Sequence, residues 1–153
     1  MITYRKAVLS DAEKLAEMRS IFFREMNKVS SEEERIIFKQ ANLEYFSKAL
    51  YDNTFISWIA LDNEEIIATS GLSFSVVPPF FPVTDGRVAY IMNMYTVPMY
   101  RNLGIGAELF KRIVDEAKQL GYRKITLNAT EMGRPLYERY GFKETHTAMD
   151  FFI

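Results

Sequence analysis

One stretch near the middle of the chain, residues 89–120, constrains the fold more than any other part of the sequence. Residues 90–96 are mostly aromatic and large apolar residues and end before Pro98, which predicts a buried strand that stops there. From Gly106 to Leu120, apolar residues recur about every 3.6 positions with charged residues between them, and Gly121 follows as a stop signal. The stretch therefore predicts a strand, a tight loop and an amphipathic helix in direct succession.

The loop between this strand and helix, residues 101–107, contains Gly104 and Gly106. Two glycines let the backbone come close to a ligand, because no Cβ stands in the way. The first amides of a helix have no partner within it and carry the positive end of its dipole, so they favour an anion. The loop is therefore predicted to bind a phosphate group, although a tight structural turn would explain the two glycines equally well.

The other elements follow from composition and turn signals. They are a strand at residues 2–8, a helix from Ser10 with a capping box to Glu13, a helix from Ser30 or Ser31, a hairpin of strands 54–61 and 66–77, a strand at 124–129, a short helix ending at Tyr140, and one or two strands within 142–153. In the second helix, the predicted buried stripe is Ile37, Ala41, Tyr45 and Ala49, widened by Ile36, Leu43, Phe46 and Leu50. This order predicts a single α/β domain whose mixed sheet is covered by helices on both faces.

Composition excludes several classes of protein. The chain has 153 residues, of which 48% are apolar. We therefore expect one folded domain with a hydrophobic core and no extensive disorder. A net charge of −1 provides no general attraction to nucleic acid or to an anionic membrane, and the absence of cysteine excludes disulfides and thiolate metal sites. No apolar run reaches the ~18 residues of a membrane span or forms a signal peptide. We expect a cytoplasmic protein without a metal, a nucleic-acid partner or a membrane partner.

Two common phosphate-binding motifs do not fit the loop. The dinucleotide pattern G-x-G-x-x-G requires a third glycine where Leu109 stands, and the nucleotide P-loop requires Gly-Lys-Ser/Thr at its end. The sequence Arg101-x-x-Gly104-x-Gly106 after a strand instead resembles the Arg/Gln-x-x-Gly-x-Gly/Ala motif of the GCN5-related N-acetyltransferases. Residues 136–142, LYERYGF, are similar to the late Tyr-x-x-x-Gly-Phe segment of that family. Two motifs in the family's order are more specific than either alone.

The resemblance covers nearly the whole chain and implies the family's fold, a mixed and mostly antiparallel central sheet with helices on both faces, over residues 1–153. It also implies transfer of an acetyl group from acetyl-CoA to a primary amine of a small molecule or peptide. The cosubstrate would lie where strand 90–96 separates from strand 124–129. The residues implied to bind it are Met94, Tyr95, Thr96, Val97, Arg101, Asn102, Leu103, Gly104, Ile105, Gly106, Ala107, Asn128 and Arg134.

Two of these assignments have alternatives within the sequence. Asn128 would bind the pantetheine chain, but an asparagine at a strand end also suits a turn. Arg134 would bind the 3′-phosphate of CoA; Lys111, Arg112 and Lys143 are the other nearby basic residues, and the first two suit a solvated helix face.

The predicted catalytic residue is Tyr137, which aligns with the family tyrosine that protonates the leaving thiolate. A phenol with an ordinary pKa near ~10 is protonated at neutral pH and can donate its proton. The alternative is that Tyr137 only packs on the sheet. No general base is assigned, because residues 90–96 contain no carboxylate; Glu25, Glu131 and His146 are unsupported candidates.

The acceptor side is predicted from the first helix and from a proline-rich loop. Phe22 and Phe23 lie in the helical region that lines the acceptor side in the family, and Asn93 could orient the acceptor or a water. Phe80 and Phe81, within residues 78–82, could form a substrate lid, a dimer contact or an ordinary loop. These aromatic residues would favour an apolar or aromatic amine.

Two other functions remain open at this level. A non-catalytic acyl-CoA-binding or regulatory module would explain the missing strand carboxylate, whereas Tyr137 favours an enzyme. Transfer to a protein lysine or N-terminus is a third possibility. The resemblance also makes a homodimer possible.

Overall fold

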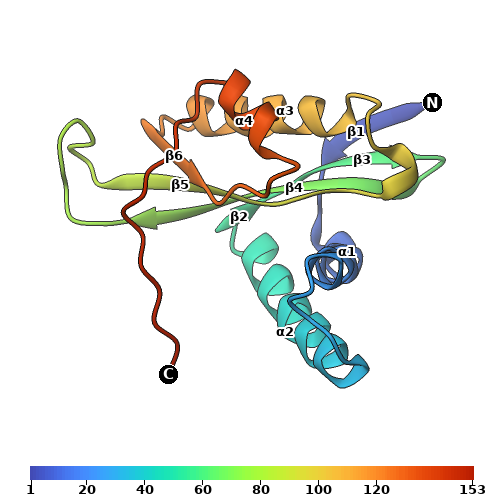
Figure 1. Cartoon of the computed structure of the whole chain (residues 1–153). Coiled ribbons are helices and arrows are strands. Elements are labelled where there is room, and N and C mark those ends of the chain that lie inside the picture. Colours follow the sequence, from blue (N-terminus) through green and yellow to red (C-terminus); the bar gives the residue numbers. More distant parts are fainter.

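The computed structural model describes residues 1–153 and is organised around one six-stranded sheet (Figure 1). The strand order is β1-β3-β4-β5-β6, with the short β2 beside β4, and every pair is antiparallel except β5 and β6. The mixed, mostly antiparallel sheet predicted from the sequence is therefore confirmed. The strands are β1 (Ile2–Lys6), β2 (Phe55–Ile56), β3 (Trp58–Asp62), β4 (Glu65–Val76), β5 (Arg87–Thr96) and β6 (Lys124–Leu127).

Helices cover both faces of this sheet, with α1 and α2 on one side and α3 and α4 on the other (Figure 1). None of them combines the length and the apolar character that crossing a bilayer requires. The helices are α1 (Ala12–Glu25), α2 (Glu32–Tyr51), α3 (Ile105–Gln119) and α4 (Arg134–Arg139), and short 3₁₀ turns lie at Leu9–Asp11 and Pro98–Tyr100.

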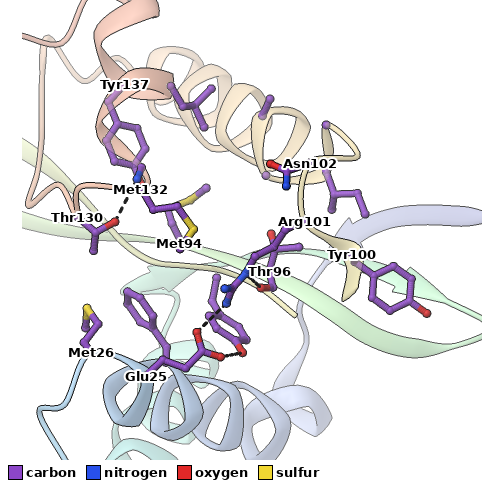
Figure 2. Close-up of a pocket in the computed structure, with 18 of the residues that line it drawn as sticks. Glu25, Met26, Met94, Thr96, Tyr100, Arg101, Asn102, Thr130, Met132 and Tyr137 are labelled. Atoms are coloured by element: carbon purple, nitrogen blue, oxygen red, sulfur yellow. Dashed lines mark hydrogen bonds and ion pairs between the residues drawn. The ribbon is translucent and has the colours of Figure 1, made fainter. Parts of the chain in front are cut away.

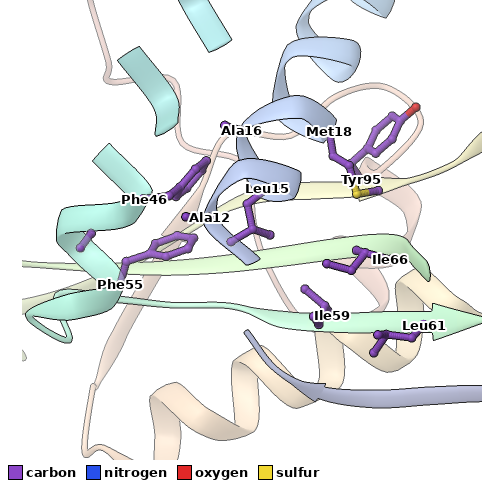
Figure 3. Close-up of a cluster of buried hydrophobic side chains, with 11 residues drawn as sticks. Ala12, Leu15, Ala16, Met18, Phe46, Phe55, Ile59, Leu61, Ile66 and Tyr95 are labelled. Carbon is purple, nitrogen blue, oxygen red and sulfur yellow. The ribbon is translucent and has the colours of Figure 1, made fainter. Parts of the chain in front are cut away.

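The core lies on both faces of the sheet. On the α1 and α2 face, Leu15 and Phe46 pack against Phe55 of β2, and all three are almost fully buried (Figure 3). On the other face, Phe110 and Ile113 of α3 are fully buried against β4 and β5. Burying one such side chain contributes about 1.5–3 kcal/mol, so the stripe predicted for α3 fixes this helix on the sheet.

Helix starts were predicted with mixed success. At α2, the predicted start at Ser30 or Ser31 is confirmed, and a capping box forms there: Ser31 Oγ accepts the Glu34 amide at 3.0 Å and the Glu34 carboxylate accepts the Ser31 amide at 3.1 Å. At α1, the predicted box from Ser10 to Glu13 is wrong, because residues 9–11 form a 3₁₀ turn. The Asp11 carboxylate instead accepts the Val8 amide at 2.7 Å.

The predicted buried stripe of α2 is also wrong in part. Ile37 is 63% exposed and Tyr45 is 43% exposed, whereas Phe46 and Ala49 are buried. Apolar residues occur on several sides of this helix, so the pattern alone did not select one face. Figure 1 shows the reason: α2 projects away from the sheet, and only its C-terminal part lies near the strands.

The predicted strands within residues 142–153 are absent. This segment leaves the domain as an extended chain (Figure 1), and Phe151 and Phe152 are 88% and 90% exposed. A strand preference expresses how well side chains fit a half-buried pleated surface, and residues 143–153 are exposed and pair with no strand.

Candidate active site

A gap opens between β5 and β6 because the two strands pair over only part of the length of β5. Pairing runs from Val88 to Ile91 of β5, and residues 92–96 have no partner on the β6 side. At the same place β5 contains a bulge. Gly71 of β4 pairs with Met92 and Thr69 pairs with Tyr95, so one residue of β4 lies opposite two residues of β5. A bulge bends its strand and increases the local twist, which here accompanies the separation from β6.

Asn93 forms the bulge and is held there by β4. Its φ of 57° is a left-handed conformation that asparagine tolerates better than most residues. The Thr69 hydroxyl donates to the Asn93 carbonyl at 2.9 Å. Ala89 and Ile91 face α3, and after the extra residue Met94 faces the same side. The bulge therefore decides which side chains of the second half of β5 face the gap.

A cavity of about 440 Å³ lies in this gap (Figure 2). It extends from the loop before α3, past the end of β5, to α1 and α4. The structure brings together most of the residues predicted to bind acetyl-CoA, because Met94, Tyr95, Thr96, Arg101, Asn102, Gly104, Ile105, Gly106 and Ala107 line this cavity. Val97, Leu103 and Arg134 do not line it, and Asn128 lines a smaller neighbouring cavity.

The loop presents unpaired amides to the larger cavity. The amides of residues 104–107 donate no hydrogen bond within the protein, and Gly104 adopts a φ of 79° that directs the chain into α3. A Cβ on Gly106 would meet only the Thr96 hydroxyl, at 3.6 Å. Packing within the protein therefore does not require glycine at this position. The missing side chain leaves room for a ligand at the positive end of the helix.

The backbone at the end of β5 also faces the cavity. The amide of Val97 donates to the Ile67 carbonyl of the β4 side at 3.0 Å. Because successive amides of a strand point in opposite directions, the amide of Thr96 points away from β4 and toward the gap. The Thr96 carbonyl points the same way and accepts from Arg101 Nε at 2.9 Å.

Arg101 belongs to a cluster with Glu25 and Tyr95, here called the Glu25 cluster. Arg101 Nη2 pairs with Glu25 Oε2 at 2.7 Å, and Tyr95 Oη donates to Glu25 Oε1 at 2.7 Å (Figure 2). The cluster joins α1, β5 and the loop. The arginine of the motif thus links the loop to α1 and to the end of β5.

The Glu25 cluster also determines two pKa values. Burial and the hydrogen bond to Glu25 raise the pKa of Tyr95 to about 12. Burial tends to raise the pKa of Glu25, but hydrogen bonds from Arg101 and Tyr95 outweigh it and the pKa is lowered. A carboxylate that two donors hold in its ionised form is a poor proton acceptor, so the geometry argues against Glu25 as a base.

Tyr137 stands on the opposite side of the cavity, on α4 (Figure 2). It is 8% exposed, its ring lies 4.9 Å from the Phe110 ring, and burial raises the pKa of its phenol. A Cβ on Gly133 would lie 2.8 Å from the Tyr137 ring, so this position of the tyrosine requires glycine at 133. Gly133 is visible in the sequence, but only the packing shows that it makes room for the Tyr137 ring.

A second cavity of about 170 Å³ adjoins the first, and Met94 and Tyr137 line both. The predicted acceptor residues Phe22, Phe23 and Asn93 contribute to its lining. It also contains Arg19 and Lys28, which the sequence analysis missed. Arg19, Phe23 and Met26 follow the i, i+4, i+7 spacing of one helix face, and this spacing could have revealed Arg19.

Several other predicted residues lie outside both cavities. Phe80 and Phe81 belong to the loop between β4 and β5; Phe80 lies 4.8 Å beneath Lys124 Nζ, and Phe81 is 91% exposed. Arg134 pairs with Glu144 at 3.2 Å. The side chain of His146 is 83% exposed, and Glu131 lines neither cavity.

Asn128 Nδ2 donates to Tyr90 Oη at 3.1 Å. No group of three or more His, Asp or Glu side chains converges in a way that could hold a metal ion.

Comparison with known proteins identifies relatives over most of the chain. The model of the Acetyltransferase (GNAT) family matches residues 15–142. YhfO, an uncharacterised N-acetyltransferase of Bacillus subtilis (strain 168), is 31% identical over 105 residues, which are 66% of this chain and 68% of that protein. The chain spans only 38% and 50% of the lengths of two further curated N-acetyltransferases that it matches.

Two solved structures match nearly the full chain. A predicted acetyltransferase with acetyl-CoA from Clostridium acetobutylicum is 35% identical with a TM-score of 0.90, covering 99% of this chain and 96% of the other. A GCN5-related N-acetyltransferase from Ralstonia eutropha JMP134 is 29% identical with a TM-score of 0.88, covering 100% and 99%.

Proposed function

Because the chain belongs to the acetyltransferase (GNAT) family, we propose that it transfers an acetyl group from acetyl-CoA to a primary amine of a small molecule or peptide. One observation carries the proposal: the unpaired amides of residues 104–107, the end of β5 and the Tyr137 phenol all face one cavity of about 440 Å³. The first group suits a pyrophosphate, and the last suits a leaving thiolate.

The loop would hold the pyrophosphate of acetyl-CoA by the amides of residues 104–107, with Gly106 providing the space. The amide of Thr96 is directed into the gap and can stabilise negative charge that develops on a carbonyl oxygen beside it. The acetyl thioester supplies the activated carbonyl carbon. No residue of the protein need form a covalent bond with the acetyl group, because both cavities meet at Met94 and Tyr137 and permit direct transfer.

Tyr137 would serve as the general acid. The amine nitrogen forms a bond to the acetyl carbon, and the carbon–sulfur bond breaks as the Tyr137 hydroxyl gives its proton to the sulfur. The nitrogen then loses a proton, through solvent, to the Tyr137 phenolate, which leaves a neutral amide and restores the phenol. Since burial raises the pKa of this phenol, the proton is present throughout the neutral and mildly alkaline range.

No residue of the site is assigned as the base. Glu25 is the only carboxylate that lines either cavity, and Arg101 and Tyr95 already hold it. We therefore propose that the amine reacts in its uncharged form after losing its proton to water.

A second candidate function is a non-catalytic acyl-CoA-binding module. The absence of a free base among the lining residues favours it. Transfer to a protein amine is a third, which detection of acetyl-lysine in a treated lysate would reveal. The cytoplasmic location and the homodimer expected from the sequence also stay predictions, and analytical ultracentrifugation tests the homodimer.

Calorimetric titration with acetyl-CoA tests the proposal first, with NADH and ATP as control nucleotides. We expect acetyl-CoA alone to bind, and amines then to release CoA thiol in a coupled colour assay. Failure to bind acetyl-CoA would overturn the proposed function. Binding without thiol release from any amine would favour the non-catalytic module.

A further inference from the structure

The smaller cavity has an unusual electrostatic character. Its lining contains the cations Arg19 and Lys28 and no aspartate or glutamate. Arg19 forms no ion pair and no hydrogen bond within the protein; its guanidinium lies 4.5 Å from the centre of the Phe23 ring. On the cofactor side, by contrast, Arg101 pairs with Glu25 at 2.7 Å.

Arg19 is largely withdrawn from water without a carboxylate to compensate. Burial lowers the pKa of its guanidinium, and the opposing influences come from the phenols of Tyr90 and Tyr45. A buried charge is costly unless it is paired, so a cation in this setting favours an anionic ligand. Arginine is well suited to that role, since its planar donors match a carboxylate or a phosphate.

Asn93 provides a second and independent observation. It lines the same cavity, is 3% exposed, and neither its Nδ2 nor its Oδ1 has a hydrogen-bond partner within the protein. Buried amides are almost always paired, and an exception calls for an explanation. A ligand that both donates and accepts hydrogen bonds would satisfy the two atoms at once.

The position of Asn93 relates these groups to the reaction. It directly precedes Met94, which lines both cavities, whereas Arg19 and Lys28 lie on the α1 side of the smaller cavity. The volume of about 170 Å³ is close to that of a protein cavity of about 150 Å³ that holds benzene. The space therefore fits a compact molecule.

We propose that the smaller cavity binds an acidic group of the acceptor, so that the acceptor is a small amine that also carries a carboxylate or a phosphate. Arg19 binds the acidic group with the help of Lys28, and Asn93 orients the amine toward Met94 and Tyr137. This inference rests on the proposed function and names its substrate class.

Matched pairs of amines test the inference in the CoA-release assay. The pairs are 4-aminobutanoate with butylamine, phenylalanine with 2-phenylethylamine, and O-phosphoethanolamine with ethanolamine. We expect the acidic member of at least one pair to react with a kcat/KM at least about tenfold above its neutral partner, because one charge-assisted contact is gained. The pairs also separate a carboxylate from a phosphate.

Variants of α1 assign the effect to Arg19. We expect Arg19→Gln to raise the KM of the acidic amine at least about tenfold, with little change in kcat or in the affinity for acetyl-CoA, and Arg19→Lys to recover part of the loss. Arg24→Gln is the matched control, because Arg24 is exposed on the same helix and lines neither cavity. Thermal unfolding of each variant reports whether the fold is kept.

The outcomes separate this inference from the proposed function. The subsite is overturned if the neutral amines react faster, or if Arg19→Gln leaves the KM of the acidic amine unchanged. Either result leaves the proposed acetyltransferase activity intact. If no amine reacts, the proposed function fails, and calorimetry of the same acidic amines on CoA-loaded protein decides about the subsite. Binding that Arg19→Gln abolishes supports the subsite, and no binding overturns it.

Discussion

The two sides of the cleft are built from different parts of the chain. Around the larger cavity, the proposed cofactor side, lie the backbone amides of residues 104–107 and the end of β5, which come from one continuous segment. Around the smaller cavity, the proposed acceptor side, lie Arg19, Asn93 and Tyr137, which come from α1, β5 and α4. The backbone donors thus come from neighbouring residues of the sequence, whereas the side chains around the smaller cavity come from three separate elements.

The two sides are also joined by one cluster. Glu25 lies one turn beyond Phe22 on α1, yet its carboxylate holds Tyr95 of β5 and Arg101 of the loop. Movement of α1 on the acceptor side would therefore be expected to affect the loop. Four substitutions test this division, and they are ordered here from the largest expected effect to the smallest.

The first substitution addresses the backbone side. Gly106→Asp places a carboxylate where the phosphate would bind, while an acid in the first turn of a helix is itself favourable. We expect the Kd for acetyl-CoA to rise at least about a hundredfold, equivalent to about 3 kcal/mol, with unchanged stability. Calorimetry and thermal unfolding measure the two quantities.

Gly106→Ala serves as the matched control, since its Cβ meets only the Thr96 hydroxyl at 3.6 Å. We expect it to bind acetyl-CoA with at most about a tenfold loss. An unchanged Kd in the aspartate variant would show that the phosphate does not bind at this helix end.

The second substitution removes the proposed acid. Tyr137→Phe should lower kcat about a hundredfold and leave the Kd for acetyl-CoA unchanged, because a general acid acts only on the transition state. In the unmodified protein, the raised pKa of Tyr137 means that its proton is kept beyond the ordinary range of a phenol. We therefore expect no loss of kcat between pH 7 and about pH 9 from ionisation of this group. A full rate in the phenylalanine variant would remove Tyr137 from the mechanism.

The third substitution breaks the junction between the two sides. Glu25→Gln should weaken acetyl-CoA binding severalfold and lower the free energy of unfolding by about 1 kcal/mol, a modest value because the carboxylate is partly solvated. Folding lowers the pKa of Glu25, so its contribution is present above the unfolded pKa and is lost as the pH falls through the folded pKa. Unfolding measured from pH 7 down to acid should show the two proteins converging, and a constant difference would contradict this account.

The fourth substitution tests the acceptor side with the smallest change. Asn93→Gly removes an amide that has no partner and keeps a residue suited to a φ of 57°. We expect unchanged stability within about 1 kcal/mol and a KM for the acceptor that rises about three- to tenfold. Asn93→Ala should show the same KM and lower stability, because alanine is strained in this conformation. Equal KM values in all three proteins would mean that Asn93 does not contact the acceptor.

Most residues around the larger cavity were predicted from the sequence, whereas those around the smaller cavity were predicted only in part. The strand and helix around residues 101–107 were predicted because their apolar periods are local, and the amides at 104–107 follow from helix geometry. The ion pair of Arg101 with Glu25 was not predicted, because Glu25 lies on another element, α1. Phe80 and Phe81 were expected at the acceptor side by composition, but the β4–β5 loop carries them outside both cavities.

By itself, the sequence determined the order of the elements, the glycine loop and the identity of the family, because these depend on residues that are neighbours along the chain. Only the tertiary structure decided that Asn93 forms a bulge, that Arg19 lacks a carboxylate partner and that residues 142–153 do not join the sheet. Pairing, burial and isolation are relations between distant residues, and their energies arise only when the chain has brought those residues together.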